Sequence, residues 1–244
     1  WFPLHDNDAR IHGVNSIAVD PEDNDIIYIT CNNSMSDFSN YSSGVFKSVN
    51  GGQSWSKLMA PDSTTYPTNY FGASVRHIVL HPVNPEILFL TTYKNVFKSL
   101  DQGITWQRIF DKNYFRWEDT VSTNFDNHNG LFDLEVDCLN DSLYYLAGSE
   151  IFVIKDSLNF IDTTNISQEV LLIGHDPGDS LLSRPHRAAV TVDNHFPGIA
   201  WFCYVAEYKI NDTALTLLRI VEYSSIDQSF DLIFEDYNDI GAGG

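Results

Sequence analysis

The sequence predicts an all-β protein made of four similar repeats. Apolar residues make up 43% of the 244 residues and aromatic residues 14%, beside many Asn, Asp, Ser and Thr residues that favour turns. Short segments of alternating apolar and polar residues recur along the chain, and few segments have the period of an amphipathic helix. We expect a chain of this length to bury about 70–75% of its unfolded surface, which is enough for a substantial core.

Each repeat begins with a short alternating strand, and the four copies align at residues 14–20, 75–81, 131–137 and 187–193. Eight residues after the Asp or His that ends each copy, an aromatic residue stands inside a second apolar segment: Tyr28, Phe89, Tyr145 and Trp201. A third strand, such as 44–48 or 95–99, and a short fourth strand complete the unit. Stacked units of four short antiparallel strands are the blades of a β-propeller.

The repeats set the predicted boundaries. Blade one covers residues 14–58, blade two 75–110, blade three 131–164 and blade four 186–235, and residues 236–244 are a connector. Residues 1–10 resemble an isolated fourth strand, because Trp1 aligns with Trp55 and Trp106. Such a strand needs a further blade as its partner, so we expect the four blades to belong to a larger ring of roughly six to eight blades.

Two turns between third and fourth strands share the pattern Ser-x-Asp-x-Gly-x-x-Trp, with Asn in place of Asp in the first. The matching residues are Ser48, Asn50, Gly52 and Trp55 in blade one and Ser99, Asp101, Gly103 and Trp106 in blade two. Short oxygen-bearing side chains accept hydrogen bonds from their own turn, glycine permits positive φ, and tryptophan anchors the hairpin. We therefore expect these residues to hold a turn rather than a ligand. Blades three and four keep the final aromatic residue of the pattern but lack the glycine.

With this pattern the chain resembles the Asp-box (BNR) repeat propellers of sortilin-type receptors, xyloglucanases, sialidases and large exported proteins of the type IX secretion system (Por secretion). The resemblance covers most of the chain at the level of the blades, and the two intact Asp-boxes lie in blades one and two. Residues 13–21 and 44–55 are most similar to the type IX group, whose propellers are commonly non-catalytic.

The resemblance implies a secreted protein, extracellular or at the cell surface, that acts in adhesion, scaffolding or the binding of glycans or proteins. The partners that it implies are other domains of the same polypeptide, an extracellular protein or glycan, and the type IX secretion machinery. The alternative is a part of a xyloglucanase- or sialidase-like glycoside hydrolase, whose catalytic pair of carboxylates is completed after Gly244.

A tripeptide of Asp, then Ser or Thr, then an apolar residue or Thr occurs seven times, where the composition predicts roughly one or two. Bacteria with type IX secretion O-glycosylate exported proteins at this tripeptide. The resemblance therefore implies candidate O-glycosylation sites at Ser63, Thr120, Ser142, Ser157, Thr163, Ser180 and Thr213. The alternative is that Asp-Ser and Asp-Thr recur because they favour turns.

The sequence assigns no catalytic residue. A glycoside hydrolase needs two carboxylates across a cleft, and Asp37, Asp119, Asp126 and Asp133 are candidates that a chain so rich in aspartate offers by chance. The sialidase element Phe/Tyr-Arg-Ile/Leu-Pro is reduced to a fragment at 115–117.

The predicted connectors between blades supply a candidate binding surface instead. It consists of Tyr70, Phe71, Tyr114, Phe115 and Trp117. Aromatic side chains of this kind stack on sugar rings or anchor a protein partner. The alternative is that they fill gaps between the blades.

Charge and cysteine usage exclude several classes of partner. The formal charge of −19 repels nucleic acid and anionic lipid, and no apolar segment is long enough to span a bilayer. Cys31, Cys138 and Cys203 lie far apart without a metal-binding spacing, so we expect small buried residues. No cofactor or metal site is predicted, with calcium at the acidic turns 6–8, 20–25 or 126–129 as the alternative.

Overall fold

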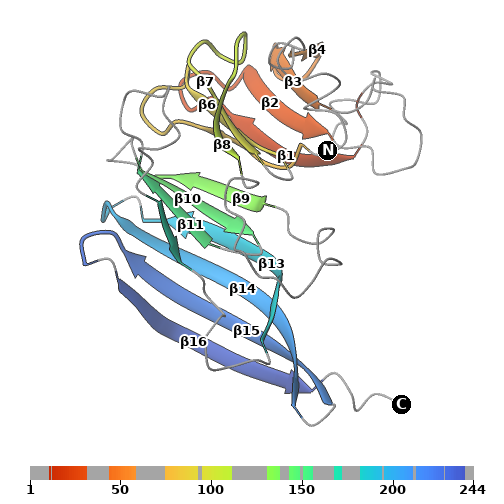
Figure 1. The fold of residues 1–244 in the computed structure, drawn as a ribbon. Coiled ribbons are helices and arrows are strands. Elements are labelled where there is room, and N and C mark those ends of the chain that lie inside the picture. Colours follow the sequence, from red (N-terminus) through yellow and green to blue (C-terminus); the bar gives the residue numbers. More distant parts are fainter. Residues whose placement is uncertain are drawn as a thin grey trace. The chain divides into compact units, whose positions relative to one another are not determined.

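The described part of the chain is all-β in the computed structural model, and its strands form four antiparallel four-stranded sheets (Figure 1). The structure describes residues 11, 13–31, 44–58, 75–92, 95–111, 131–137, 143–148, 151–155, 168–171, 182–193, 195–210, 213–227 and 229–239. Strands that follow one another in the chain are paired in each sheet, so every sheet is a meander. This arrangement confirms the predicted fold class of four-stranded antiparallel blades.

The sheets are numbered one to four along the chain. Sheet one contains β1 (Val14–Val19), β2 (Ile26–Cys31), β3 (Gly44–Val49) and β4 (Ser56–Lys57), and sheet two contains β5 (Ile78–Leu80), β6 (Leu88–Thr91), β7 (Asn95–Ser99) and β8 (Gln107–Asp111). Sheet three contains β9 (Leu131–Val136), β10 (Leu143–Gly148), β11 (Ile151–Lys155) and β12 (Gln168–Leu171), and sheet four contains β13 (Leu182–Val192), β14 (Ile199–Ile210), β15 (Thr213–Ser224) and β16 (Ser229–Asp239). The first two sheets lie in one compact unit, Trp1–Asp119, and the last two in another, Thr120–Gly244.

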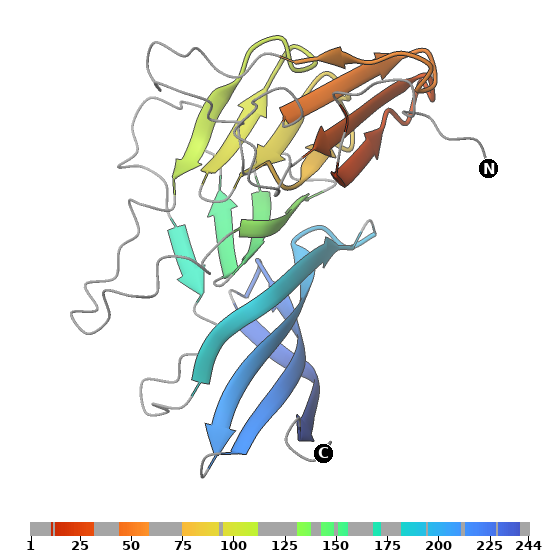
Figure 2. The ribbon, with the colours of Figure 1, turned by 90° about the vertical axis from the view of Figure 1, so that its right-hand side faces the viewer.

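The later sheets extend past the ranges expected from the repeat. The fourth strand of sheet three is β12, which follows residue 164, and sheet four spans 182–239 rather than 186–235. Strands β14 and β15 remain paired from Ile199 and Ser224 to Ile210 and Thr213, so one long hairpin replaces the short strands of sheets one and two. Figure 2 shows these long twisted strands in blue. Residues 236–239 therefore belong to β16, while 1–10 and 240–244 lie outside the described residues.

Sheets one and two enclose the core of the first unit. Tyr28 and Val45 of sheet one pack with Ile78, Leu90 and Phe97 of sheet two, and all five side chains are buried. Alternation along the strands places these residues on facing sides. Each fully buried large apolar side chain stabilises the unit by about 1.5–3 kcal/mol.

Polar side chains of sheet one also form hydrogen bonds to the second repeat. The Asn15 amide nitrogen donates to the Val75 carbonyl at 2.9 Å, and the Thr30 hydroxyl donates to the Arg76 carbonyl at 3.0 Å. The Lys47 ammonium donates to the Gln102 side-chain oxygen at 2.7 Å. The two sheets are thus held by directional bonds as well as by apolar packing.

The second unit repeats this packing. Tyr145 and Ala147 of sheet three contact Val190, Phe202 and Tyr223 of sheet four in one buried cluster. The Tyr145 ring meets the Phe202 and Tyr223 rings edge to face, with centroid distances of 6.1 Å in both cases. Tyr145 holds the place in its repeat that Tyr28 holds in the first, and both are fully buried.

Candidate functional site

The predicted site residues fall into two groups. All eight residues of the two predicted Asp-boxes are described, and each set of four lies in one turn. The candidate binding surface lies outside the described residues: Tyr70, Phe71, Tyr114, Phe115 and Trp117. The same holds for the candidate glycosylation residues Ser63, Thr120, Ser142, Ser157, Thr163 and Ser180. Thr213, the seventh, begins β15 and pairs with Ile210 at the end of the long hairpin.

The turn of sheet two is organised around the buried hydroxyl of Ser99. This oxygen accepts hydrogen bonds from the Gly103 amide at 2.8 Å and the Asp101 amide at 3.3 Å, and it donates to the Asp101 carboxylate at 2.8 Å. The Trp106 indole nitrogen donates to the Gly103 carbonyl at 3.0 Å. Gly103 has a φ of +86°, which side-chain-bearing residues rarely adopt. The polar groups of this turn therefore bond to one another.

The turn of sheet one has the same plan with a neutral side chain at its centre. Ser48 accepts from the Gly52 amide at 2.8 Å, and the Asn50 side-chain oxygen accepts from the Ser54 amide at 2.9 Å. The Asn50 side-chain nitrogen donates to the Ser54 hydroxyl at 2.8 Å. In sheet two the corresponding bond runs the other way, because the Thr105 hydroxyl donates to the Asp101 carboxylate at 2.6 Å. The same turn can therefore contain either an amide or a carboxylate side chain at this position. The hydroxyl four residues later accepts a hydrogen bond from the amide of Asn50 and donates one to the carboxylate of Asp101.

Hydrogen bonding stabilises the ionised form of Asp101. The Thr105 hydroxyl and amide are the main donors, the Ser99 hydroxyl and the Ile104 amide add to them, and together they lower the pKa of the Asp101 carboxyl. The direction is opposite to that required of a general acid, whose pKa must be raised. Asp101 is therefore suited to holding a turn.

The residue that follows the first strand of a repeat caps the next turn. The Asp20 carboxylate accepts from the amides of Glu22 and Asp23, at 2.8 and 3.3 Å. In the second repeat His81 takes this place, and its Nδ1 accepts from the amides of Val83 and Asn84, at 3.1 and 3.0 Å. A neutral imidazole nitrogen thus does what a carboxylate oxygen does in the first repeat.

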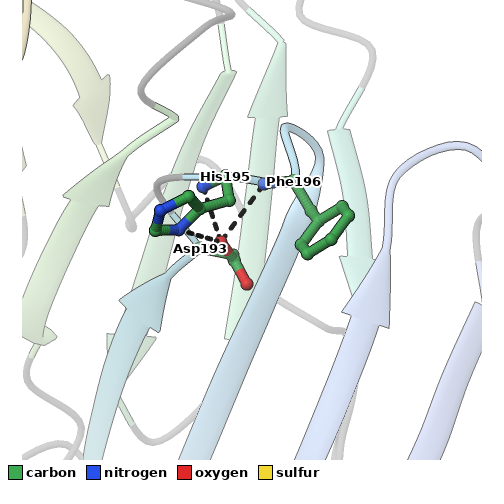
Figure 3. A network of polar contacts seen from close by, with 3 residues as sticks. All are labelled: Asp193, His195 and Phe196. Carbon is green, nitrogen blue, oxygen red and sulfur yellow. Dashed lines mark hydrogen bonds and ion pairs between the residues drawn. The ribbon is translucent and has the colours of Figure 1, made fainter.

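Asp193 caps the corresponding turn of sheet four (Figure 3). Its Oδ1 accepts from the amides of His195 at 2.6 Å and Phe196 at 3.2 Å, and the exposed His195 ring lies 3.5 Å from the same oxygen. The repeat alignment contained the signal for this capping role, because each aligned segment ends in Asp or His. Sequence reasoning used that residue only as a landmark and missed its function.

Two aspartates of the third repeat connect sheets three and four. Asp133, a candidate catalytic carboxylate, accepts from the Leu134 amide with one oxygen and from the Val190 amide with the other, both at 3.0 Å. The buried Asp137 accepts from the Gly198 amide at 2.5 Å. The other candidates, Asp37, Asp119 and Asp126, lie outside the described residues.

Charged groups also surround the buried Tyr28. Burial, with a smaller contribution from the Asp20 carboxylate, raises the pKa of Tyr28 to about 12. The Lys47 ammonium lies 5.3 Å from the centre of the Tyr28 ring. Burial lowers the pKa of Lys47, and the Asp20 carboxylate acts in the opposite direction. Tyr28 therefore stays protonated at physiological pH and acts as a packing residue.

Within the described segments, no three His, Cys, Asp or Glu residues gather as a metal site. The acidic turn at 20–25 directs carboxylate oxygens of Asp20 and Asp23 at backbone amides, and the turns at 6–8 and 126–129 lie outside these segments. Cys31 is buried in an apolar cluster of sheet one, as expected, whereas Cys203 of β14 is only partly buried and Cys138 lies outside the described residues. Over the same segments, no helix is long and apolar enough to cross a membrane.

The four-stranded meanders and their face-to-face packing define the class of protein as a β-propeller fold. No family model matches the chain. Over 116 residues the chain is 28% identical to the xyloglucanase Xgh74A of Acetivibrio thermocellus. The aligned region covers 45% of this chain and 14% of that protein.

A solved structure supports the same class. The chain is similar to the crystal structure of the GH74 xyloglucanase from Xanthomonas campestris, with a TM-score of 0.60 and 16% identity. The match covers 93% of this chain and 31% of the xyloglucanase chain. An ancestral GH74 enzyme also matches 93% of this chain, with a TM-score of 0.47 and 18% identity. The chain spans 14% of the curated relative and 31% of the first solved one.

Proposed function

We propose that the chain is a segment of a non-catalytic extracellular β-propeller that serves adhesion, scaffolding or the binding of a glycan or protein. The observation that carries this proposal is the structural role of four carboxylates in the described part of the chain. Asp20, Asp101, Asp133 and Asp193 each accept hydrogen bonds from backbone amides of turns or of a neighbouring sheet. A retaining or inverting hydrolase instead needs a carboxylate pair that faces the substrate, with the pKa of the acid raised.

A glycan is the partner that the comparisons favour. The relatives are named as xyloglucanases, and the fold of the chain is that of a solved xyloglucanase. Aromatic residues of the predicted connectors, led by Tyr114 and Trp117, are the proposed stacking surface for sugar rings. The Asp-box turns are proposed to have a structural part in this account, because their polar groups bond to one another.

The second candidate function is a part of a glycoside hydrolase of the xyloglucanase type. The 28% identity to a xyloglucanase over 116 residues is the specific observation in its favour. Function depends on the site rather than on the fold, so this candidate requires a carboxylate pair at a substrate cleft.

Export by a type IX route is part of the same proposal. It is supported by the excess of Asp-Ser/Thr tripeptides, and Thr213 offers one such hydroxyl residue at the end of a hairpin. Peptide mapping of native protein by mass spectrometry tests it. Glycan mass on the peptide that contains Thr213, or on the other six, is expected, and seven unmodified peptides contradict the route.

The binding proposal is tested by titration calorimetry of the chain with xyloglucan oligosaccharides, beside an assay for new reducing ends. We expect heat of binding without new reducing ends. A double change, Tyr114→Ala with Trp117→Ala, should abolish the heat and leave the melting temperature unchanged. A large fall in melting temperature assigns these residues to packing, and release of reducing ends selects the hydrolase candidate.

A further inference from the structure

Four large apolar side chains of the first unit are exposed at one end of its two sheets. In a four-stranded meander, the connection between the first two strands and the connection between the last two leave the same end of the sheet. The exposed residues lie in these connections or at the strand end that enters them. We call them the apolar tips; they are Val49, Val83, Leu100 and Ile104, exposed by 64%, 70%, 64% and 73%. A group of such residues at one end of a unit indicates a contact surface.

Hydrogen bonds hold the turns that carry the apolar tips. In sheet one the Gly51 amide donates to the Asp25 carbonyl at 3.0 Å, and in sheet two the Gln102 amide donates to the Glu86 carbonyl at 2.8 Å. Between the two sheets the Lys47 ammonium donates to the Gln102 side-chain oxygen. The two turns of each sheet are therefore joined, and the two sheets are tied together close to these turns.

The same place in the predicted Asp-box carries an apolar tip in both sheets. Val49 and Leu100 each stand between the Ser and the Asn or Asp of the pattern. In sheet four, taken by itself, Ile226 has the corresponding place and is 79% exposed, and Phe196 in the other turn at that end is 66% exposed. The hydrogen bonds of the two Asp-box turns use the flanking side chains and the backbone. The fold therefore does not require an apolar side chain at this place.

The turns of the apolar tips are also acidic. The four turns span residues 20–25, 49–55, 81–87 and 100–106, all of them described, and contain no Lys or Arg. Their acidic residues are Asp20, Glu22, Asp23, Asp25, Glu86 and Asp101. The side chains of Glu22, Asp23, Asp25 and Glu86 are exposed. Such a surface attracts cationic groups and repels anionic ones.

We propose that the apolar tips and the carboxylates of the same turns bind a cationic amphipathic segment of another polypeptide. The apolar side chains of that segment cover the tips, and its Lys or Arg side chains pair with exposed carboxylates such as Glu22 and Glu86. Two copies of this chain that met at these turns would bring carboxylates against carboxylates, and nucleic acid and anionic lipid are repelled for the same reason. The inference is independent of the proposed glycan binding, because it uses other residues and another class of partner.

Fluorescence anisotropy with a labelled synthetic peptide tests the class of partner. The probe contains leucine and lysine in the pattern of an amphipathic helix, and its control has glutamate in place of lysine. We expect the 244-residue chain to bind the lysine peptide only, and more weakly as salt is raised, because salt screens exposed charges. Absence of binding to the lysine peptide, or equal binding of both peptides, overturns the proposal.

A triple variant tests whether the apolar tips are the binding surface. It removes three tips without a change of charge: Val49→Thr, Leu100→Thr and Ile104→Thr. The matched control removes three exposed apolar residues of β1: Val14→Thr, Ile17→Thr and Val19→Thr. We expect the Kd to rise at least about tenfold in the tip variant and less than about twofold in the control. Equal losses in the two variants, or no loss in the tip variant, overturn the proposal.

Two further measurements separate the charges and the kind of partner. The pair Glu22→Gln and Glu86→Gln keeps the shape of the surface, and we expect a smaller dependence of the Kd on salt, because two of the paired charges are lost. An unchanged salt dependence contradicts the assigned pairing. Phosphatidylcholine vesicles are the second probe, and no binding is expected. Vesicle binding that the tip variant abolishes assigns the tips to a lipid surface and overturns the proposal.

Discussion

Replacement of Ser99 by alanine tests the role of the predicted Asp-box turns most sharply. Ser99 is 1% exposed, and its hydroxyl accepts from the buried Gly103 amide and donates to the Asp101 carboxylate. An unsatisfied buried amide costs about 1–3 kcal/mol, and a hydrogen bond to a charged group contributes about 1.5–3 kcal/mol. The two costs are not additive, because Asp101 keeps the hydrogen bonds from Thr105. We therefore expect the free energy of unfolding to fall by about 2–3 kcal/mol.

Urea denaturation monitored by tryptophan fluorescence measures this loss, since Trp106 lies in the same turn. The matched control is Ile104→Ala, because Ile104 is 73% exposed in that turn and its side chain carries no hydrogen-bonding group. The control should change the free energy of unfolding by less than about 0.5 kcal/mol. If Ser99→Ala costs no more than the control, the turn does not depend on its serine, and the structural interpretation of the motif is refuted.

Three further predictions concern turns and contacts between sheets. Because the folded-state pKa of Asp101 is lowered, its contribution is complete above the unfolded pKa of about 3.9 and is lost as pH falls through the folded value. Asp101→Asn should remove this acid sensitivity, and Asn50→Asp should add a corresponding one in the first turn. The free energy of unfolding measured between pH 6 and 2 tests both. If each variant shows the same pH dependence as the unchanged chain, the assigned role of the Asp101 carboxylate is refuted. Gly103→Ala should cost at least about 1–2 kcal/mol because φ is +86°, and a neutral result in thermal unfolding refutes it. Asp133→Ala should cost about 1–3 kcal/mol in urea denaturation by leaving the Val190 amide without its acceptor. Asp133→Asn should cost less but more than nothing, because its single side-chain oxygen can accept from only one of the two amides of Leu134 and Val190.

The repeat in the sequence was sufficient to predict that the chain forms four-stranded antiparallel sheets. Alternation and the aromatic residue at a fixed offset located Tyr28 and Tyr145, and both are fully buried between sheets. The predicted turns also hold the expected residues, because their hydrogen bonds are local and depend on short spacing along the chain. Local interactions of this kind are encoded in neighbouring residues and can be recognised without a structure.

Contacts between sheets could not be predicted in the same way. Asp133 was one of several interchangeable aspartates until the structure placed its oxygen beside the Val190 amide. The capping role of His81 was hidden because a neutral imidazole replaces a carboxylate. The length of sheet four depends on pairing between β14 and β15, and pattern alone gave its ends less accurately than its centre.

A saturation-transfer experiment by ¹H NMR tests the central functional proposal most directly. The chain is mixed with a xyloglucan oligosaccharide, and saturation of the protein is followed by observation of the anomeric protons of the sugar. We predict saturation transfer to the intact oligosaccharide and no new reducing-end signals over the course of the experiment. New reducing-end signals, or a complete lack of transfer, contradict a non-catalytic propeller that binds a glycan.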